Sequence, residues 1–121
     1  MRPHEKLDLW KKSVDLSVAV YKITEQFPRE ERFGLVSQIR RASVSIAANI
    51  AEGAARRTSK EFLNFLSISQ GSASELETEL LIAQRLEFLS KEDYATLVDQ
   101  IDEIGRMITG LSNYLRTKLE K

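Results

Sequence analysis

Apolar residues recur at steps of three and four along most of the chain, the spacing that places side chains on one face of an α-helix. The clearest stripe runs through the last third: Tyr94, Leu97, Ile101, Ile104, Ile108, Leu111 and Leu115. An earlier stripe consists of Phe62, Phe65, Leu66, Ser69, Ala73, Leu76, Leu80 and Ala83. A shorter one opens the chain: Leu7, Trp10, Val14, Ser17, Val18 and Tyr21. No segment alternates in the manner of a β-strand, so the pattern predicts an all-α fold.

Residues typical of helix ends divide this pattern into four helices, over residues 6–26, 30–55, 59–88 and 91–119. Phe27 precedes a proline, which disfavours helical backbone at that position. Thr58 and Glu61 have the spacing of a capping box, and Ser90 is a typical N-cap. Because the connections are short, successive helices should run antiparallel. The sequence therefore predicts one domain, residues 1–121, folded as an up-down-up-down four-helix bundle.

The second predicted helix contains the segment GLVSQIRRASVSIAANIAEG, residues 34–53, and its apolar surface is unusually wide. One strip should face the core: Leu35, Ile39, Ala42, Ile46, Ile50 and Gly53. A second arc of small and apolar residues supplies candidates for an oligomer interface: Val36, Ser43, Val44, Ala47 and Ala51. A continuous exposed apolar patch invites association, so we expect this arc to pack against a second copy of the chain. The alternative is an alanine-rich surface that is merely tolerated, since alanine is the best helix former.

A polar strip borders these two surfaces and consists of Gln38, Arg41, Ser45, Asn49, Glu52 and Arg56. It has two interpretations. In the first, these side chains pair within or between subunits, because a charge near an interface needs a partner. In the second, repeated copies of the strip around an assembly form a polar groove for phosphate.

Charge is balanced overall but not along the chain. The 18 basic and 18 acidic side chains cancel, so the general basic excess of a strong nucleic-acid binder is absent. Residues 29–60 nevertheless carry seven positive and three negative side chains, and residues 61–103 carry two positive and ten negative ones. Arg56, Arg57 and Lys60 lie where the second helix ends and the third begins. There they either complement the helix dipole or, with free backbone N–H groups, hold a phosphate.

The composition argues against several classes of function. The chain has no cysteine, which excludes disulfides, thiolate metal sites and a cysteine nucleophile. His4 is the only histidine, so the Glu-x-x-His pairs of a di-iron bundle cannot be formed. We therefore expect no enzyme, no cofactor and no metal site. No long uncharged apolar stretch or signal peptide is present, so we expect a soluble, cytoplasmic protein with no membrane partner.

Four phrases, ERFGL, QIRRA, ANIAEG and KEF, give the chain a specific resemblance. From about Leu7 to about Leu115 it resembles the bacterial family of four-helix proteins encoded within intervening sequences of 23S ribosomal RNA genes. That family is related to the accessory variability protein of diversity-generating retroelements. The resemblance implies an antiparallel bundle assembled into a ring-like homopentamer. It also implies a basic surface for RNA or DNA, with a reverse transcriptase as a possible protein partner, and by position the candidates are Arg40, Arg41, Arg56, Arg57 and Lys60.

Two hypotheses about function follow. In the first, a homo-oligomer binds nucleic acid weakly through the basic residues of the second helix and of the turn that follows it. In the second, the assembly is a protein–protein adaptor. Its acidic surface would then meet a basic partner through residues of the third and fourth helices, Glu77, Glu79, Glu87, Asp99 and Asp102.

Overall fold

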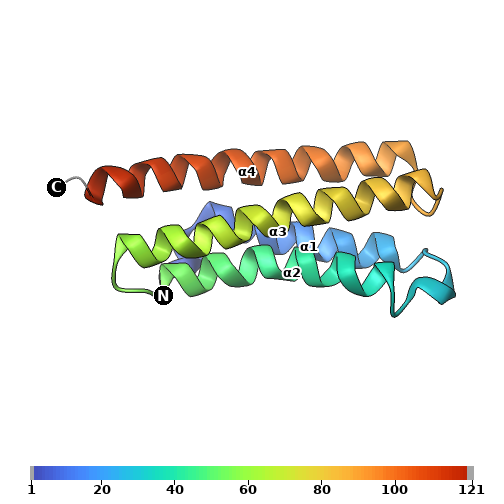
Figure 1. Cartoon of the computed structure of the whole chain (residues 1–121), viewed down its shortest axis with the longest axis horizontal. Helices are drawn as coiled ribbons and strands as arrows, with labels where there is room; N and C mark the ends of the chain where they lie inside the picture. Colours follow the sequence, from blue (N-terminus) through green and yellow to red (C-terminus); the bar gives the residue numbers. More distant parts are fainter. Residues whose placement is uncertain (1, 120–121) are drawn as a thin grey trace.

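The computed structural model describes residues 2–119 and shows four long helices packed side by side (Figure 1). They are α1 (Asp8–Thr24), α2 (Leu35–Ala54), α3 (Ser59–Arg85) and α4 (Lys91–Leu119). Two short 3₁₀ turns, η1 (Pro3–Lys6) and η2 (Arg29–Glu31), precede α1 and α2. No β-strand occurs within residues 2–119. The predicted all-α four-helix bundle is confirmed.

Contacts between helices establish that neighbours run in opposite directions. The hydroxyls of Ser17 on α1 and Ser43 on α2 lie 3.1 Å apart, while Arg40, earlier on α2, bonds to Thr24, later on α1. The hydroxyls of Ser45 on α2 and Ser72 on α3 lie 2.8 Å apart, while Ser69, earlier on α3, bonds to Ile46, later on α2. Figure 1 shows α4 running back alongside α3. Residue numbers therefore rise on one helix as they fall on the next.

The predicted apolar stripes form the core. The largest fully buried apolar side chains come from all four helices: Leu16, Val20, Ile39, Ile46, Ile50, Leu66, Leu76, Leu80 and Ile104. Burying a side chain of this size contributes about 1.5–3 kcal/mol to the free energy of unfolding. The apolar stripes predicted from the sequence thus supply the buried side chains that stabilise the bundle. No helix within residues 2–119 is both long enough and apolar enough to span a bilayer.

The N-caps predicted for α3 and α4 are present. Thr58 Oγ1 accepts a hydrogen bond from the Glu61 backbone N–H at 3.1 Å and lies 2.9 Å from Glu61 Oε1. Ser90 Oγ accepts a bond from the Asp93 backbone N–H at 3.0 Å. Each cap satisfies an amide that the first helical turn leaves unpaired. These two helix starts match the predicted residues 59 and 91.

The end of α4 at Leu119 also matches, but the remaining boundaries differ from the prediction. The first helix ends at Thr24 rather than at residue 26, and the second begins at Leu35 rather than at residue 30, because η2 and Gly34 occupy the intervening residues. The third helix ends at Arg85 rather than at residue 88. Glu87 has a φ of 66°, and the Phe88 N–H bonds to the Ala83 carbonyl at 2.9 Å. This left-handed residue with its backward bond is a common way to end a helix.

Gly53 belongs to the strip of α2 that was predicted to face the core, and it is buried there. It lies inside α2 and is buried against α3. A Cβ atom at this position would lie 2.8 Å from both Phe65 Cβ and Phe62 Cδ1. The glycine therefore permits α2 and α3 to approach closely.

Candidate nucleic-acid interface

The turn between α2 and α3 gathers three exposed basic side chains, Arg56, Arg57 and Lys60. Arg56 is the most firmly placed of them. Its Nη2 lies 2.8 Å from Glu52 Oε1, one helical turn earlier, and its guanidinium lies 4.9 Å from the centre of the Phe65 ring. These contacts position the guanidinium at the end of the bundle while leaving it in contact with water.

A hollow of about 670 Å³ lies beside this turn. Arg56 and Lys60 form its basic side, and Leu63, Asn64 and Phe65 form much of the rest. Arg57 and Lys60 form no ion pair within residues 2–119. Glu61 also lines the hollow, but its carboxylate is engaged with the Thr58 hydroxyl of the α3 cap. The arrangement offers cationic groups to an anion.

Arg40 and Arg41 lie far from this turn. With a rise of 1.5 Å per residue, Arg41 and Arg56 are roughly 22 Å apart along α2. Arg40 is half-buried and holds the end of α1: its Nε donates to Thr24 Oγ1 at 2.9 Å and its Nη2 donates to the Tyr21 carbonyl at 3.2 Å. Arg41 is exposed and donates to Ser37 Oγ at 3.2 Å. The five predicted basic residues are therefore not one patch, and only three of them meet.

Three of the five predicted interface residues are covered within the subunit. Val36, Ser43 and Ala47 are 5%, 0% and 9% exposed, respectively. The Ser43 hydroxyl donates to the Arg40 carbonyl at 2.8 Å and meets Ser17 of α1. The expectation that these three residues face outward is wrong, because each is buried within the subunit, Ser43 against α1. A second copy of the chain is not needed to cover them.

Other apolar side chains do remain exposed. Val44 is 44% exposed and Ala51 is partly exposed, so these two predicted interface residues are still accessible. Further exposed apolar side chains lie on α1 and α3: Val18, Tyr21, Ile68, Ile82 and Leu86. The surface available for association is thus wider than α2 alone.

The polar strip of α2 pairs mostly within its own helix. Asn49 Nδ2 donates to the Ser45 carbonyl at 2.9 Å and to Ser45 Oγ at 3.0 Å. Glu52 pairs with Arg56, as described above. Ser45 also reaches Ser72 of α3. This agrees with the first interpretation of the strip, pairing within the subunit.

The acidic surface on α3 and α4 also differs from the prediction, because Glu79 is only 6% exposed. Burial, the charge of Glu75 and a hydrogen bond with Glu75 raise the pKa of Glu79 from 4.5 to about 7. Its Oε1 has no hydrogen-bond partner within residues 2–119. Glu75 and Glu79 do share a helix face, but Glu79 is buried rather than available to a partner. Nothing in the local sequence distinguished it from its exposed neighbours.

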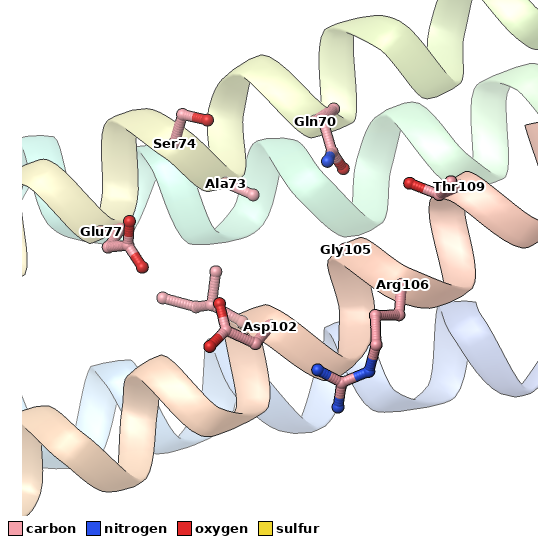
Figure 2. A pocket seen from close by; sticks show the side chains of 9 residues that line it. Gln70, Ala73, Ser74, Glu77, Asp102, Gly105, Arg106 and Thr109 are labelled. Atoms are coloured by element: carbon pink, nitrogen blue, oxygen red, sulfur yellow. The ribbon is translucent and has the colours of Figure 1, made fainter.

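Glu77 of α3 and Asp102 of α4 both line a hollow of about 430 Å³ between these helices (Figure 2). Gln70 and Ser74 of α3 line it too, as do Arg106 and Thr109 of α4. Both acids were predicted to belong to one acidic surface of the third and fourth helices, and the packing of α3 against α4 places them around one hollow. Neither carboxylate forms an ion pair within residues 2–119.

Two arginines that sequence reasoning left out of the candidate set also have a place in the structure. Arg29 and Arg32 line a hollow beside η2, together with Arg40. Their spacing of three residues was the available signal, because in a 3₁₀ turn residues i and i+3 lie on the same side. No group of three or more histidine, aspartate or glutamate side chains within residues 2–119 is arranged to hold a metal ion.

The four antiparallel helices and the basic turn can now be set against known proteins. A crystal structure at 1.70 Å of a protein of unknown function from the S23 ribosomal protein family of Bacteroides thetaiotaomicron VPI-5482 has the same fold. It is 27% identical, with a TM-score of 0.78 over 86% of this chain and 97% of that one. Curated proteins contain no significant match. The family model described as 23S rRNA-intervening sequence protein matches residues 5–110. Since that match covers nearly all of the helical bundle, the chain belongs to the 23S rRNA-intervening sequence protein family.

Proposed function

We propose that this protein is a non-enzymatic homo-oligomer, with five subunits in a ring, that binds nucleic acid weakly through its backbone phosphates. The observation that carries the proposal is the cluster of exposed Arg56, Arg57 and Lys60 on the α2–α3 turn. Guanidinium and ammonium groups are the usual protein contacts for phosphate oxygens. Glu52 balances only part of this charge.

The binding should be insensitive to sequence. Base-specific recognition of a single strand needs aromatic rings on which bases can stack. Phe65 lies beside the basic turn, and the Arg56 guanidinium already lies over its ring. Phosphate contacts therefore provide the affinity, and the affinity should fall as salt rises.

Assembly would strengthen such weak contacts, because identical sites on one particle bind a long strand with increased avidity. The exposed apolar side chains on three helices support assembly, with Val44 at the centre of the accessible part of α2. Side chains of this kind are uncommon as a group on a protein that stays monomeric.

Nucleic-acid binding is tested by fluorescence anisotropy with single-stranded RNA and DNA of one length, at about 50 and 200 mM salt. We expect micromolar binding that weakens with salt and falls at least about tenfold in Arg56→Ala/Arg57→Ala, since each lost phosphate contact also removes counterion release. The matched control is Lys22→Ala/Arg85→Ala, which removes the same charge from exposed positions outside the turn. Undetectable binding at low salt, or equal loss in both double variants, would refute the proposal.

Assembly is tested by sedimentation velocity of the wild type and of Val44→Glu. We expect a particle of several subunits that dissociates in the variant while the helical circular dichroism signal is retained. Ala47→Glu is not suitable, because Ala47 is covered by its own subunit and a charge there would disturb the fold. Asn113→Glu serves as the control at an exposed polar position. A wild-type protein that sediments as a single chain contradicts this part of the proposal.

The adaptor hypothesis keeps one supporting observation, the pair of carboxylates formed by Glu77 and Asp102 across the α3–α4 hollow. A basic side chain of a protein partner would fit between them by charge. This function is favoured if nucleic acid fails to bind at low salt and a Lys/Arg-rich peptide binds the wild type but not Glu77→Gln/Asp102→Asn.

A further inference from the structure

A hollow of about 450 Å³ lies where the end of α1 meets η2 and the first turns of α2. Its floor includes the buried side chains of Thr24, Phe27 and Val36. Arg29, Arg32 and Arg40 line its basic side. Glu25 is the one carboxylate among the lining residues, so the lining carries three positive charges and one negative charge.

Arg40 is held in place before any ligand arrives. Its guanidinium bonds to the Thr24 hydroxyl and the Tyr21 carbonyl and lies 4.6 Å from the centre of the Tyr21 ring. These contacts use the N–H of Nε and one N–H of Nη2, so both N–H groups of Nη1 and the second one of Nη2 remain for a ligand. A donor that is already oriented loses less conformational freedom on binding.

Arg29 and Arg32 complete the basic side of the hollow. Both are exposed; Arg29 opens η2 and Arg32 follows it as the C-cap, with its backbone N–H bonded to the Arg29 carbonyl at 3.1 Å, so this turn brings the two side chains to one side. The nearby Glu31 carboxylate is turned towards the start of α2, where Oε1 lies 3.4 Å from the Leu35 backbone N. None of the three arginines forms an ion pair within residues 2–119.

We infer that this hollow is a binding site for a small phosphorylated anion, whose terminal phosphoryl group lies among Arg29, Arg32 and Arg40. Planar guanidinium groups match the oxygen geometry of phosphate and bind it through paired hydrogen bonds. The volume lies at the small end of the range for ligand pockets. Three guanidinium groups around one hollow suit a single multiply charged ligand. The exposed α2–α3 turn, in contrast, suits successive phosphates along a nucleic-acid strand.

The site is tested by isothermal titration calorimetry of the full chain with three probes: inorganic phosphate, inorganic pyrophosphate and ADP. We expect one pyrophosphate per chain and at least a tenfold loss of affinity in Arg29→Ala/Arg32→Ala. Equal binding of pyrophosphate and ADP identifies the phosphoryl group as the recognised part, whereas tighter ADP binding points to a nucleotide. Arg32→Lys keeps the charge but loses the paired geometry, so it should lie between the wild type and the double variant.

Two controls separate this proposal from the nucleic-acid site. Lys22→Ala/Arg85→Ala should leave pyrophosphate binding unchanged, and so should Arg56→Ala/Arg57→Ala. Conversely, Arg29→Ala/Arg32→Ala should leave single-stranded RNA binding within about twofold of the wild type, because its residues are remote from the turn. The inference is overturned if pyrophosphate does not bind, if it binds Arg29→Ala/Arg32→Ala as tightly as the wild type, or if binding is lost only in the Arg56/Arg57 variant. Thermal unfolding of each variant verifies that the bundle is intact.

Discussion

The two edges of α3 are built in different ways. Along the edge that faces α2, the helices are in close contact: Gly53 lies against Phe62 and Phe65, and the Ser69 hydroxyl donates to the Ile46 carbonyl at 3.0 Å. Along the edge that faces α4, buried side chains such as Leu76 and Ile104 belong to the same core, but a polar hollow of about 430 Å³ lies between the outer faces of the two helices. Gly105 borders this hollow, and a Cβ atom there would lie 3.7 Å from Gln70 Nε2, an ordinary contact distance.

This difference shows that small residues have two distinct uses in one bundle. Gly53 and Gly105 both interrupt an apolar stripe, and the sequence around them does not tell them apart. Only the first glycine allows the partner helix to approach, while the second borders open space. The α2–α3 edge should therefore be sensitive to small changes, and the α3–α4 edge should tolerate them.

The largest effect is expected for Gly53→Ala. The added methyl group would overlap Phe65 Cβ, which cannot move without its backbone, so α2 and α3 must separate locally. Overpacking of this kind costs about 1–3 kcal/mol, and the better helix propensity of alanine offsets up to about 1 kcal/mol of that cost. Urea denaturation followed by circular dichroism should show a clear net loss of stability.

Gly105→Ala is the matched control on the other edge. It gains the same helix propensity without a clash, so it should be neutral or stabilise the protein by up to about 1 kcal/mol. If both substitutions destabilise the protein equally, the two edges of α3 do not differ in the way described.

The next effect concerns the buried carboxyl of Glu79. It lies one helical turn after Glu75, on the side of α3 where Ser72 contacts Ser45 of α2. Its pKa is about 7 in the folded chain and ordinarily 4.5. The folded state therefore retains a proton that the unfolded state releases, so stability falls as the pH rises from 4.5 to about 7 and stays low above that. Glu79→Gln keeps the size of the side chain and removes this charge.

We expect Glu79→Gln to stabilise the protein at pH 8 by about 1–2 kcal/mol, less than the full shift suggests because solvent near the exposed Glu75 screens the pair. Below pH 4.5 the variant and the wild type should converge. Thermal unfolding across pH 4–8 measures this, with Glu87→Gln at an exposed position as the control. A wild-type stability that does not fall between pH 4.5 and 7 would show that Glu79 ionises as an exposed carboxyl does.

Local features of the fold could be predicted from sequence. The caps at Thr58 and Ser90 depend on residues three positions apart, and the apolar stripes depend on periodicity along one helix. The start of α2 at Leu35 was predicted incorrectly, because the segment after Pro28 has helix-forming composition but its backbone follows a 3₁₀ turn and Gly34. Boundaries set by the path of a connection are not encoded in periodicity.

Features that depend on the neighbouring helix were harder to predict. The sequence indicated that α2 is covered on two sides, but it could not show that Val36, Ser43 and Ala47 are buried within the same subunit. It identified Arg56, Arg57 and Lys60 as adjacent because one turn contains them. It could not show that Arg40 is fixed against α1 or that Arg29 and Arg32 join it around a hollow. Each of these features depends on packing between segments distant in sequence.

A smaller effect is expected for Ser69→Ala, again on the α2 edge. Ser69 is fully buried, and its hydroxyl bridges to the Ile46 carbonyl of α2. Removing one buried hydrogen bond costs about 0.5–1.5 kcal/mol, and no partner replaces the lost donor. Thr109→Ala removes a hydroxyl that lines the α4-side hollow and is exposed, so urea denaturation should detect no loss there. Equal losses from the two substitutions would mean that both edges exclude water to the same degree.

The smallest effect is expected for the acids on the open edge. Glu77 and Asp102 line the hollow between α3 and α4, where water can surround both carboxylates. Changes at accessible positions usually alter stability by less than about 0.5 kcal/mol, so Glu77→Gln/Asp102→Asn should unfold in urea close to the wild type. Glu79→Gln changes a carboxyl only two residues from Glu77 on the same helix. We nevertheless expect it to change the free energy of unfolding more, because Glu79 is buried. If the double variant on the open edge changes stability more than Glu79→Gln does at pH 8, the hollow is not open to water and the contrast between the two edges of α3 fails.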